Sequence, residues 1–168
     1  MAALESLHLE RIHRKSSENE TLLPMRYLKT IQRMLEQTLH LKDLSIGRLV
    51  GPTEYLDMTT LKLVQQPGLQ DLVLQFCIIS EAWLLREILQ HRATLTYIIL
   101  NKVKLTEGDD WAHTLSTLRS KSNLYPNLET FTVIDSDAGV KEFDAAGFLT
   151  HKTQQNPSLR KTKPLNIS

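Results

Sequence analysis

The chain has 168 residues, and its hydrophobic fraction of 41% is typical of a globular protein rather than of a disordered one. Its 20 Lys and Arg residues nearly balance its 19 Asp and Glu residues, which leaves a formal net charge of +1. That balance argues against a dedicated nucleic-acid binder, whose affinity depends on neutralising many phosphates. No apolar run reaches the roughly 18 residues that a membrane-spanning helix needs. We therefore expect an intracellular, soluble protein of the cytoplasm or nucleus that binds neither nucleic acid nor membrane.

One spacing of apolar residues recurs five times along the chain, at the first, fourth, sixth and ninth positions of a short window. In chain order the windows are Leu4-Leu7-Leu9-Ile12, Leu41-Leu44-Ile46-Leu49, Leu69-Leu72-Leu74-Cys77, Leu95-Ile98-Leu100-Val103 and Leu128-Phe131-Val133-Ser136. Of these 20 positions 19 are apolar, where composition alone predicts about 8, and only 5 of the 25 positions between them are apolar. This alternation predicts a short β-strand in each window.

The segments between the windows carry apolar residues at helical spacing, together with residues that start helices. Proline is tolerated in the first turn of a helix, and Ser, Thr and Asp cap its amino end. The expected helices, in chain order, run from Pro24 to Leu39, from a Thr53 cap through Leu56 and Leu63, from a Ser80 cap, from an Asp109 or Asp110 cap and, more weakly, from Asp144. Each unit is then a strand, a turn and a helix.

The eleven-residue window Leu69–Ile79 matches the leucine-rich-repeat signature L-x-x-L-x-L-x-x-N/C-x-L, with Ile at the last position. A single repeat cannot bury its own apolar face, but stacked neighbours share one core. The pattern therefore predicts an α/β fold of about five strand–helix units with parallel strands. We assign residues 1–155 to this repeat domain and 156–168 to a flexible basic C-terminal tail. An ordinary doubly wound α/β domain is the alternative that also explains alternating strands and helices.

The Leu69–Ile79 window, followed by Ser-Glu-Ala-Trp-Leu-Leu at residues 80–85, resembles the leucine-rich-repeat regions of fungal F-box-like proteins. The likeness continues through the Leu95–Leu105 window and Trp111-Ala112 to the Tyr125–Glu129 step, and it covers residues 41–135. It implies a curved α/β solenoid of the ribonuclease-inhibitor-like type whose surface recognises other proteins. In F-box proteins that surface presents substrates to a ubiquitin ligase.

The F-box itself is a helical module of about forty to fifty residues that precedes the repeats. Here the first repeat-like window begins at Leu4, and only about sixteen residues separate Leu23-Pro24-Met25, which resembles the start of an F-box, from the window at Leu41. We interpret that segment as a proline-started repeat helix and expect no F-box. A truncated relative, a fragment of a longer product and a stand-alone repeat protein all remain open.

In each predicted strand, the residues between the leucines point to the face opposite the core. The candidate partner-binding residues of the concave face are Asp71, Val73, Gln75, Tyr97, Ile99, Asn101, Thr130 and Thr132. The same rows include Ile134 in the fifth window, Asp43 and Ser45 in the second, and Ser6, His8 and Glu10 in the first. Aromatic and aliphatic side chains within a polar rim are typical of protein-binding hot spots. Alternatively, these residue types merely suit a parallel sheet.

Residues capable of chemistry are present, but they do not form a recognisable catalytic or metal-binding motif. The six histidines lack metal-ligand spacing, Cys77 is expected to be buried and inert, and no glycine-rich phosphate loop occurs. Two carboxylate groups follow strands, namely Glu107, Asp109 and Asp110, and then Asp135, Asp137 and Asp144. We expect them to cap helices, and we expect no catalytic residue, metal or cofactor.

These observations predict a non-enzymatic protein-interaction module with a protein partner, which would be a substrate-recognition part if the F-box-like resemblance holds. A small α/β enzyme that uses a carboxylate cluster is one alternative, and a truncated gene product without independent function is another. No polar cap is evident before Leu4. Because an open solenoid end exposes core and strand backbone, we expect marginal stability or self-association through such ends.

Overall fold

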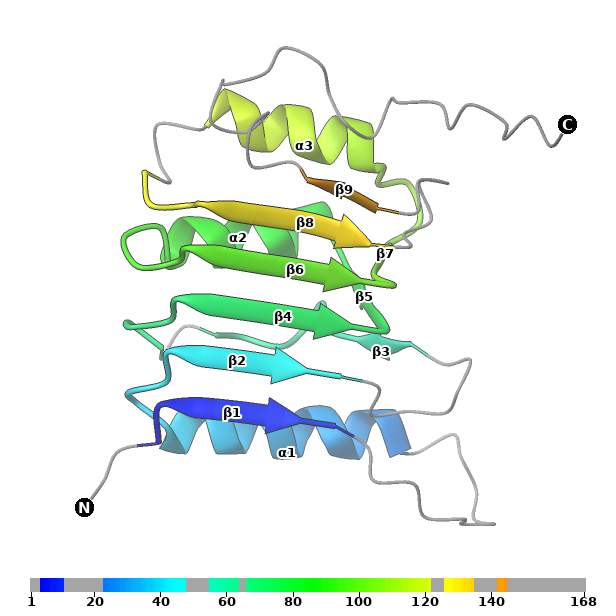
Figure 1. Ribbon diagram of the computed structural model, residues 1–168. Coiled ribbons are helices and arrows are strands. Elements are labelled where there is room, and N and C mark those ends of the chain that lie inside the picture. Colours follow the sequence, from blue (N-terminus) through cyan, green and yellow to red (C-terminus); the bar gives the residue numbers. More distant parts are fainter. Residues whose placement is uncertain are drawn as a thin grey trace, which may run out of the picture.

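A computed structural model of the chain describes residues 4–10, 23–47, 55–63, 66–121, 126–134 and 142–144. These residues form an α/β fold with two β-sheets (Figure 1). The larger sheet contains, side by side, β1 (Ser6–Leu9), β2 (Asp43–Ile46), β4 (Asp71–Gln75), β6 (Tyr97–Asn101), β8 (Thr130–Ile134) and β9 (Glu142–Asp144). The smaller sheet contains β3 (Leu56–Asp57), β5 (Cys77–Ile79) and β7 (Lys104–Leu105). The described helices are α1 (Leu23–Gln37), α2 (Glu81–Gln90) and α3 (Trp111–Ser120).

The strands of the larger sheet lie in the order in which they occur in the chain. From β1 to β8 they are parallel, and their register aligns Leu7, Leu44, Leu72, Ile98 and Phe131. Because side chains alternate along a strand, this register places the apolar residues on one buried face and the intervening residues on the other. The strands predicted in all five windows and their parallel arrangement are therefore confirmed.

Two of these strands turn sharply into the smaller sheet. Phe76 directly follows β4 with a φ of 54°, and Lys102 directly follows β6 with a φ of 52°, so both adopt the left-handed conformation. Before the turn, the N–H of Phe76 donates to the carbonyl of Asn101 at 3.1 Å, and the N–H of Lys102 donates to that of Ile134 at 2.8 Å. Strand β5 follows the turn at Phe76, and β7 follows the turn at Lys102. Both belong to the smaller parallel sheet, whose third strand is β3, and the sequence pattern did not predict this second sheet.

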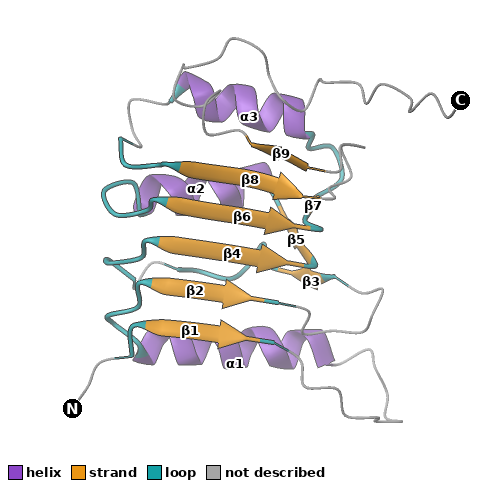
Figure 2. Ribbon diagram, viewed as in Figure 1, coloured by secondary structure: helices purple, strands orange, loops and turns teal. Residues whose placement is uncertain are grey.

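The helices begin at the predicted residues and cover a single face of the larger sheet. Ser80 Oγ accepts a hydrogen bond from the N–H of Trp83 at 3.0 Å, and Asp110 Oδ1 accepts one from the N–H of His113 at 2.8 Å. Pro24 lies in the first turn of α1, where its missing N–H costs little. In Figure 2, α2 lies behind the larger sheet, α1 lies along its β1 end and α3 lies beyond β9 at the other end. The buried apolar residues of all three helices belong to the same core cluster as the buried strand residues. Within the described residues, the helices therefore pack on the buried face of the larger sheet, whereas the doubly wound alternative places helices on both faces.

A single hydrophobic core lies between the larger sheet and the helices. The buried strand residues Leu72, Ile98 and Phe131 belong to the same cluster as Trp83 and Trp111 of the helices. Contact between these faces removes apolar surface from water at about 25 cal/mol per Å², which is the main stabilising contribution in such a fold. No helix within the described ranges is long and apolar enough to cross a membrane.

The helix expected between Thr53 and Leu63 is not formed. Leu56–Asp57 is the short strand β3, and turns and extended chain follow it, while residues 53 and 54 lie outside the described residues. Asp57 Oδ1 accepts hydrogen bonds from the N–H of Thr59 at 2.9 Å and from its hydroxyl at 2.7 Å. This Asx turn offers the backbone a local alternative to the hydrogen bonds of a helix. The expectation of one helix in every unit is therefore wrong here.

The last described strand departs from the parallel pattern. β9 runs antiparallel to β8, with Phe143 opposite Val133, so the expectation of uniformly parallel strands is wrong at this edge. Only residues 135–141 connect the two strands, and a parallel crossover needs a dozen or more residues. Asp144, the expected start of a helix, is the last residue of β9. The remainder of that expected helix and the tail 156–168 lie outside the described residues.

Candidate protein-binding face

The eight predicted partner-binding residues lie together on the face of the larger sheet that is turned away from the helices. Together with Ile134 they form three ranks of three residues across β4, β6 and β8, in register: Asp71, Tyr97 and Thr130; Val73, Ile99 and Thr132; Gln75, Asn101 and Ile134. On β1 and β2 the first two ranks continue through Ser6, Asp43, His8 and Ser45. We call these thirteen residues the sheet face.

The sheet face is accessible from one side along its whole width. Tyr97 is 37% exposed, while its rank neighbours Asp71 and Thr130 are half-buried. Neighbouring strands are about 4.8 Å apart, so side chains on one face shelter each other from solvent. None of the described helices or strands lies over this face in Figure 1. Among the described residues, the half-burial therefore comes from neighbours within the face, and no described helix or strand covers its outer surface.

The amino end of the sheet face is acidic. Asp43 and Asp71 are register partners on β2 and β4. Asp71 Oδ1 accepts a hydrogen bond from the hydroxyl of Thr96 at 3.4 Å. Lys42, which precedes Asp43 in the chain, forms an ion pair with Glu5 at 3.1 Å instead.

At the carboxyl ends of β4 and β6, basic and aromatic side chains gather where the chain turns into the smaller sheet. The ring of Tyr55 lies 6.1 Å from that of Phe76. The ammonium group of Lys102 lies 5.3 Å from the centre of the Phe76 ring, and that of Lys104 lies 4.2 Å from the centre of the Tyr55 ring. We call these four residues the cation–aromatic cluster. The two ends of the central strands therefore carry opposite charge.

The carboxylates after β7 act as helix caps, as expected. Asp110 caps its own helix α3, whereas Asp109 Oδ2 accepts hydrogen bonds from the N–H of Glu81 at 2.8 Å and from the hydroxyl of Thr106 at 2.7 Å. The N–H of Glu81 is the main cause of a lowered pKa of Asp109. Glu107 is exposed. Of the second predicted group, Asp135 and Asp137 lie outside the described residues.

Cys77 is fully buried at the start of β5, as predicted from its position in the repeat. Burial raises the pKa of its thiol to about 12. The Sγ atom donates a weak hydrogen bond to the carbonyl of Gln75 at 3.3 Å. Nucleophilic attack and metal binding both require the thiolate, so Cys77 serves as a packing residue.

Sequence reasoning missed a buried polar cluster beneath α2. The carboxylate of Glu87 accepts a hydrogen bond from Arg86 Nε at 2.7 Å and one from the N–H of Leu63 at 3.3 Å, and its Oε2 lies 3.9 Å from Nε2 of the buried His91. Desolvation raises the pKa of Glu87 and lowers the pKa of His91. Arg86 also donates to the carbonyl of Leu61 at 2.9 Å, so the cluster fastens the Leu61–Leu63 segment to α2.

The only sequence signal for that cluster is the position of Glu87 within the buried stripe of α2. The buried residues of the helix are Trp83, Leu84, Glu87 and Ile88, which share one helical face. A charged residue in such a stripe needs a partner, because an unpaired buried carboxylate is strongly unfavourable. The partner groups come from residues 61–63 and from Arg86, which the helical spacing alone does not identify.

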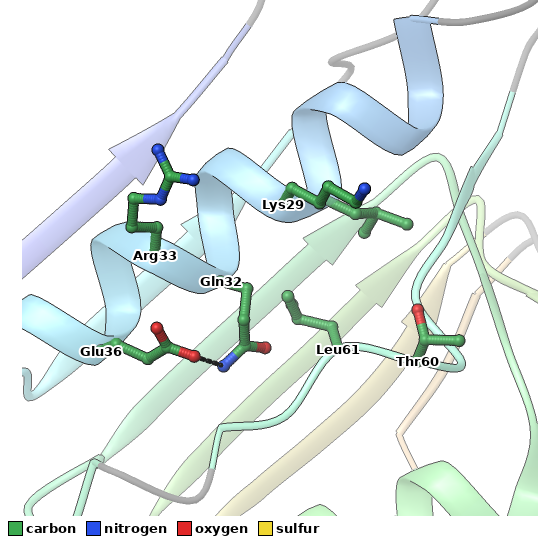
Figure 3. A pocket seen from close by; sticks show the side chains of 7 residues that line it. Lys29, Gln32, Arg33, Glu36, Thr60 and Leu61 are labelled. Atoms are coloured by element: carbon green, nitrogen blue, oxygen red, sulfur yellow. Dashed lines mark hydrogen bonds between the residues drawn. The ribbon is translucent and has the colours of Figure 1, made fainter.

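A cavity of about 370 Å³ lies between α1 and the Thr60–Leu61 segment (Figure 3). Gln32 Nε2 donates to Glu36 at 3.1 Å, and Gln32 Oε1 accepts from the N–H of Lys62 at 3.0 Å. Figure 3 shows the guanidinium of Arg33 pointing away from Leu61. The cavity therefore contains none of the sheet-face residues and no convergent set of polar groups. In the part of the chain that the structure describes, no three His, Cys, Asp or Glu side chains are placed to hold a metal ion.

Comparisons of the chain with protein-family models, with curated proteins and with solved structures found no match. The description of the sheet face therefore rests on the geometry of this chain alone. It combines an acidic amino end, an aliphatic and aromatic centre, and an outer surface that the described helices leave uncovered.

Proposed function

We propose that this protein is a non-enzymatic protein-interaction module built as a leucine-rich-repeat-like, ribonuclease-inhibitor-like curved solenoid. Its support is the recurrence of one structural unit. β4, the left-handed Phe76, β5 and α2 follow each other in the same order as β6, the left-handed Lys102, β7 and α3. Repeats of this kind stack on their neighbours and display a continuous row of strands to a ligand.

The single observation that carries the binding role is the set of in-register ranks on the uncovered sheet face. Tyr97, Val73 and Ile99 place one aromatic and two aliphatic side chains next to Asp71 and Asn101. Tyrosine is enriched among the few residues that contribute most of the binding energy in protein interfaces, and the aliphatic pair supplies apolar contact area beside Tyr97. A broad, uncovered face suits a macromolecular partner better than a small molecule, whose sites are concave pockets.

An enzymatic role for the carboxylates after β7 has less support. Asp109 and Asp110 each accept a hydrogen bond from a helix backbone N–H, at 2.8 Å in both cases. The lowered pKa of Asp109 favours its ionised form, which leaves it unsuited to act as a general acid, and the carboxylate of Asp110 is engaged as the cap of α3. If the F-box-like resemblance holds, the sheet face would select substrates for a ubiquitin ligase in the cytoplasm or nucleus.

The binding role is tested by capturing proteins from a native extract on the tagged full chain and on two face variants, Asp71→Lys and Tyr97→Ala. We expect at least one protein that both variants fail to capture. That protein is then purified, and its dissociation constant for each variant is measured. A loss of affinity of at least tenfold is expected, because removing a hot-spot side chain costs roughly 2 kcal/mol or more.

The matched control is Arg92→Glu, a charge reversal at an exposed residue just after α2. It should leave both the captured protein and its affinity within twofold of the original chain. Thermal unfolding of all four proteins verifies that each variant is folded. The sheet face is not the binding surface if Asp71→Lys and Tyr97→Ala capture the same proteins as the original chain. The same conclusion follows if Arg92→Glu reduces capture as much as the two face variants do.

A further inference from the structure

Two carboxylates stand side by side where β2 and β4 begin. Asp43 and Asp71 are register partners on neighbouring parallel strands, and both are half-buried on the sheet face. Because neighbouring strands are about 4.8 Å apart, the two side chains are immediate neighbours. Like charges placed directly opposite each other destabilise a sheet. The pair therefore lowers the stability of the free protein unless a cation lies against it.

No such cation is supplied by the described residues. Asp71 has the hydroxyl of Thr96 as a hydrogen-bond donor at 3.4 Å, and neither Asp71 nor Asp43 forms an ion pair with a described basic residue. Lys42 is adjacent to Asp43 in the chain, but its ammonium group pairs with Glu5 at 3.1 Å. The lysines of the cation–aromatic cluster lie at the other ends of the strands. The amino end of the sheet face thus presents uncompensated negative charge.

An aliphatic pair lies one rank further along the same strands. Val73 and Ile99 are register partners on β4 and β6, and Tyr97 is the register partner of Asp71. Val73 follows Asp71 by two residues, which corresponds to about 7 Å along a strand. The side chains at positions i and i+2 of an extended peptide have the same separation and point to the same side. An extended ligand can therefore engage the acidic pair and the aliphatic pair with alternate side chains.

We propose, as an extension of the protein-binding role proposed above, that the sheet face recognises an extended segment of its partner in which a basic residue and an aliphatic residue lie two positions apart. The Lys or Arg lies against Asp43 and Asp71, with the ring of Tyr97 beside it as a cation–π neighbour. The aliphatic side chain covers Val73 and Ile99. Acidic segments and nucleic acids are disfavoured, because the two carboxylates repel their charges.

The probe for this proposal is a library of random linear 12-residue peptides displayed on phage and selected on the full chain. Enriched peptides should share Lys or Arg and, two positions away from it, Leu, Ile, Val or Met, with one order of the two prevailing. One such peptide is synthesised with a fluorescent label, and its affinity is measured by anisotropy. The double variant Asp43→Asn/Asp71→Asn should bind it at least tenfold more weakly, and binding to the original chain should weaken as NaCl is raised.

The control double variant, Glu36→Gln/Glu107→Gln, removes the same number of negative charges at exposed positions outside the sheet face. Its affinity for the peptide should stay within twofold. In urea unfolding, Asp43→Asn/Asp71→Asn should be at least as stable as the original chain, because it relieves the like-charge pair. A weaker peptide affinity in that variant therefore reports lost recognition and not lost folding.

The remaining outcomes separate this proposal from the binding role on which it rests. Peptides that lose affinity with Tyr97→Ala but not with Asp43→Asn/Asp71→Asn would overturn basic recognition and leave the protein-binding face intact. A library that yields no basic–aliphatic motif, while capture from the extract still depends on Tyr97, would also overturn basic recognition and leave the protein-binding face intact. Selected peptides that are indifferent to every sheet-face variant would overturn both proposals.

Discussion

Asp109 Oδ2 accepts a hydrogen bond from the backbone N–H of Glu81, the first residue of α2, at 2.8 Å. The side chain of Glu81 reaches in the opposite direction, where its Oε2 accepts a hydrogen bond from the hydroxyl of Thr114 in α3 at 2.9 Å. The amino ends of the two helices are therefore joined reciprocally by carboxylates. Negative charge at this end of a helix is favourable because the backbone N–H groups there lack partners within the helix.

We expect Asp109→Ala to lower the free energy of unfolding by about 1–2 kcal/mol, the usual cost of deleting a capping side chain. The N–H of Glu81 loses its acceptor, and the hydroxyl of Thr106 loses one as well. Urea unfolding followed by circular dichroism measures the change. Glu107→Ala, at an exposed residue of the same connection, is the control and should change stability by less than about 0.5 kcal/mol. Equal effects of the two substitutions would contradict the cap.

The stability of the protein should depend on pH through His91. Burial lowers the pKa of His91 from its ordinary value of 6.5, so below that pH the unfolded chain binds a proton that the folded chain excludes. Stability is therefore lost as the pH falls below 6.5, by at most about 1.4 kcal/mol for each pH unit. Urea unfolding between pH 7 and pH 5 should show a shallower loss for His91→Gln. The control Gln90→Ala, at an exposed residue of the same helix, removes no titratable group and should retain the original slope.

Glu87 acts in the opposite direction within the same cluster. Burial raises its pKa from the ordinary value of 4.5, so the folded chain gains a proton before the unfolded chain does, and stability increases as the pH falls toward 4.5. Removing this contribution with Glu87→Gln should steepen the loss of stability below pH 6.5. A steeper slope for His91→Gln, or a shallower one for Glu87→Gln, would refute the assignment of these directions.

The left-handed backbone at Lys102 should make this position selective for residue type. Asn tolerates positive φ whereas a β-branched residue does not, so Lys102→Ile should be less stable than Lys102→Asn by about 1 kcal/mol. Both variants lose the contact between Lys102 and the Phe76 ring, so their difference isolates the backbone. At Lys104, in strand β7, the order should reverse, because Ile suits a strand better than Asn. The same order at both positions in thermal unfolding would be inconsistent with strain at Lys102.

The outer edge of β1 should promote self-association. Among the described strands β1 pairs only with β2, and unpaired strand edges are templates for pairing with another chain. The carbonyls of Glu5 and Leu9 accept hydrogen bonds from residues 43 and 47, so in the parallel ladder the N–H of His8 faces the outer edge. His8→Pro removes that donor without removing a bond to β2, and it should reduce association at high concentration.

Sedimentation velocity over a range of concentrations measures this association. The matched control His8→Ala removes the same side chain but keeps the N–H, and it should associate as the original chain does. Pairing through this edge would be excluded if His8→Pro associated over the same concentration range as the unsubstituted chain. It would also be excluded if the unsubstituted chain remained monomeric at every concentration.

The strands were predictable because the local alternation of apolar and polar residues matches the burial that the packed sheet requires. Leu72 and Leu74 alternate with Asp71 and Val73, and the structure buries the leucines while leaving the intervening residues accessible. The segment from Leu56 to Leu63 lacks such agreement. Its apolar residues satisfy a helical spacing, but the Asx turn at Asp57 and the pairing of β3 with β5 favour the extended form. Local spacing could not reveal a strand whose partner lies 21 residues away, as Leu56 and Cys77 do.

The sheet face was equally predictable, for a geometric reason. Once the core fixes Leu72 opposite Ile98, the two-residue period of a strand fixes Val73 opposite Ile99. Two features escaped this reasoning. Phe76 and Lys102 are not Gly or Asn, so nothing in their identity indicates a left-handed turn. The partners of Glu87 come from a separate segment and depend on how that segment packs against α2.

The order of strands in the larger sheet also has a consequence for how the chain reaches its native state. Within the larger sheet, each parallel strand pairs with the strand of that sheet that comes next in the chain. Each pairing therefore closes only the short loop formed by the residues between two such strands. Folding can therefore begin with the pairing of the central strands β4 and β6 and then add the neighbouring strands one at a time on each side.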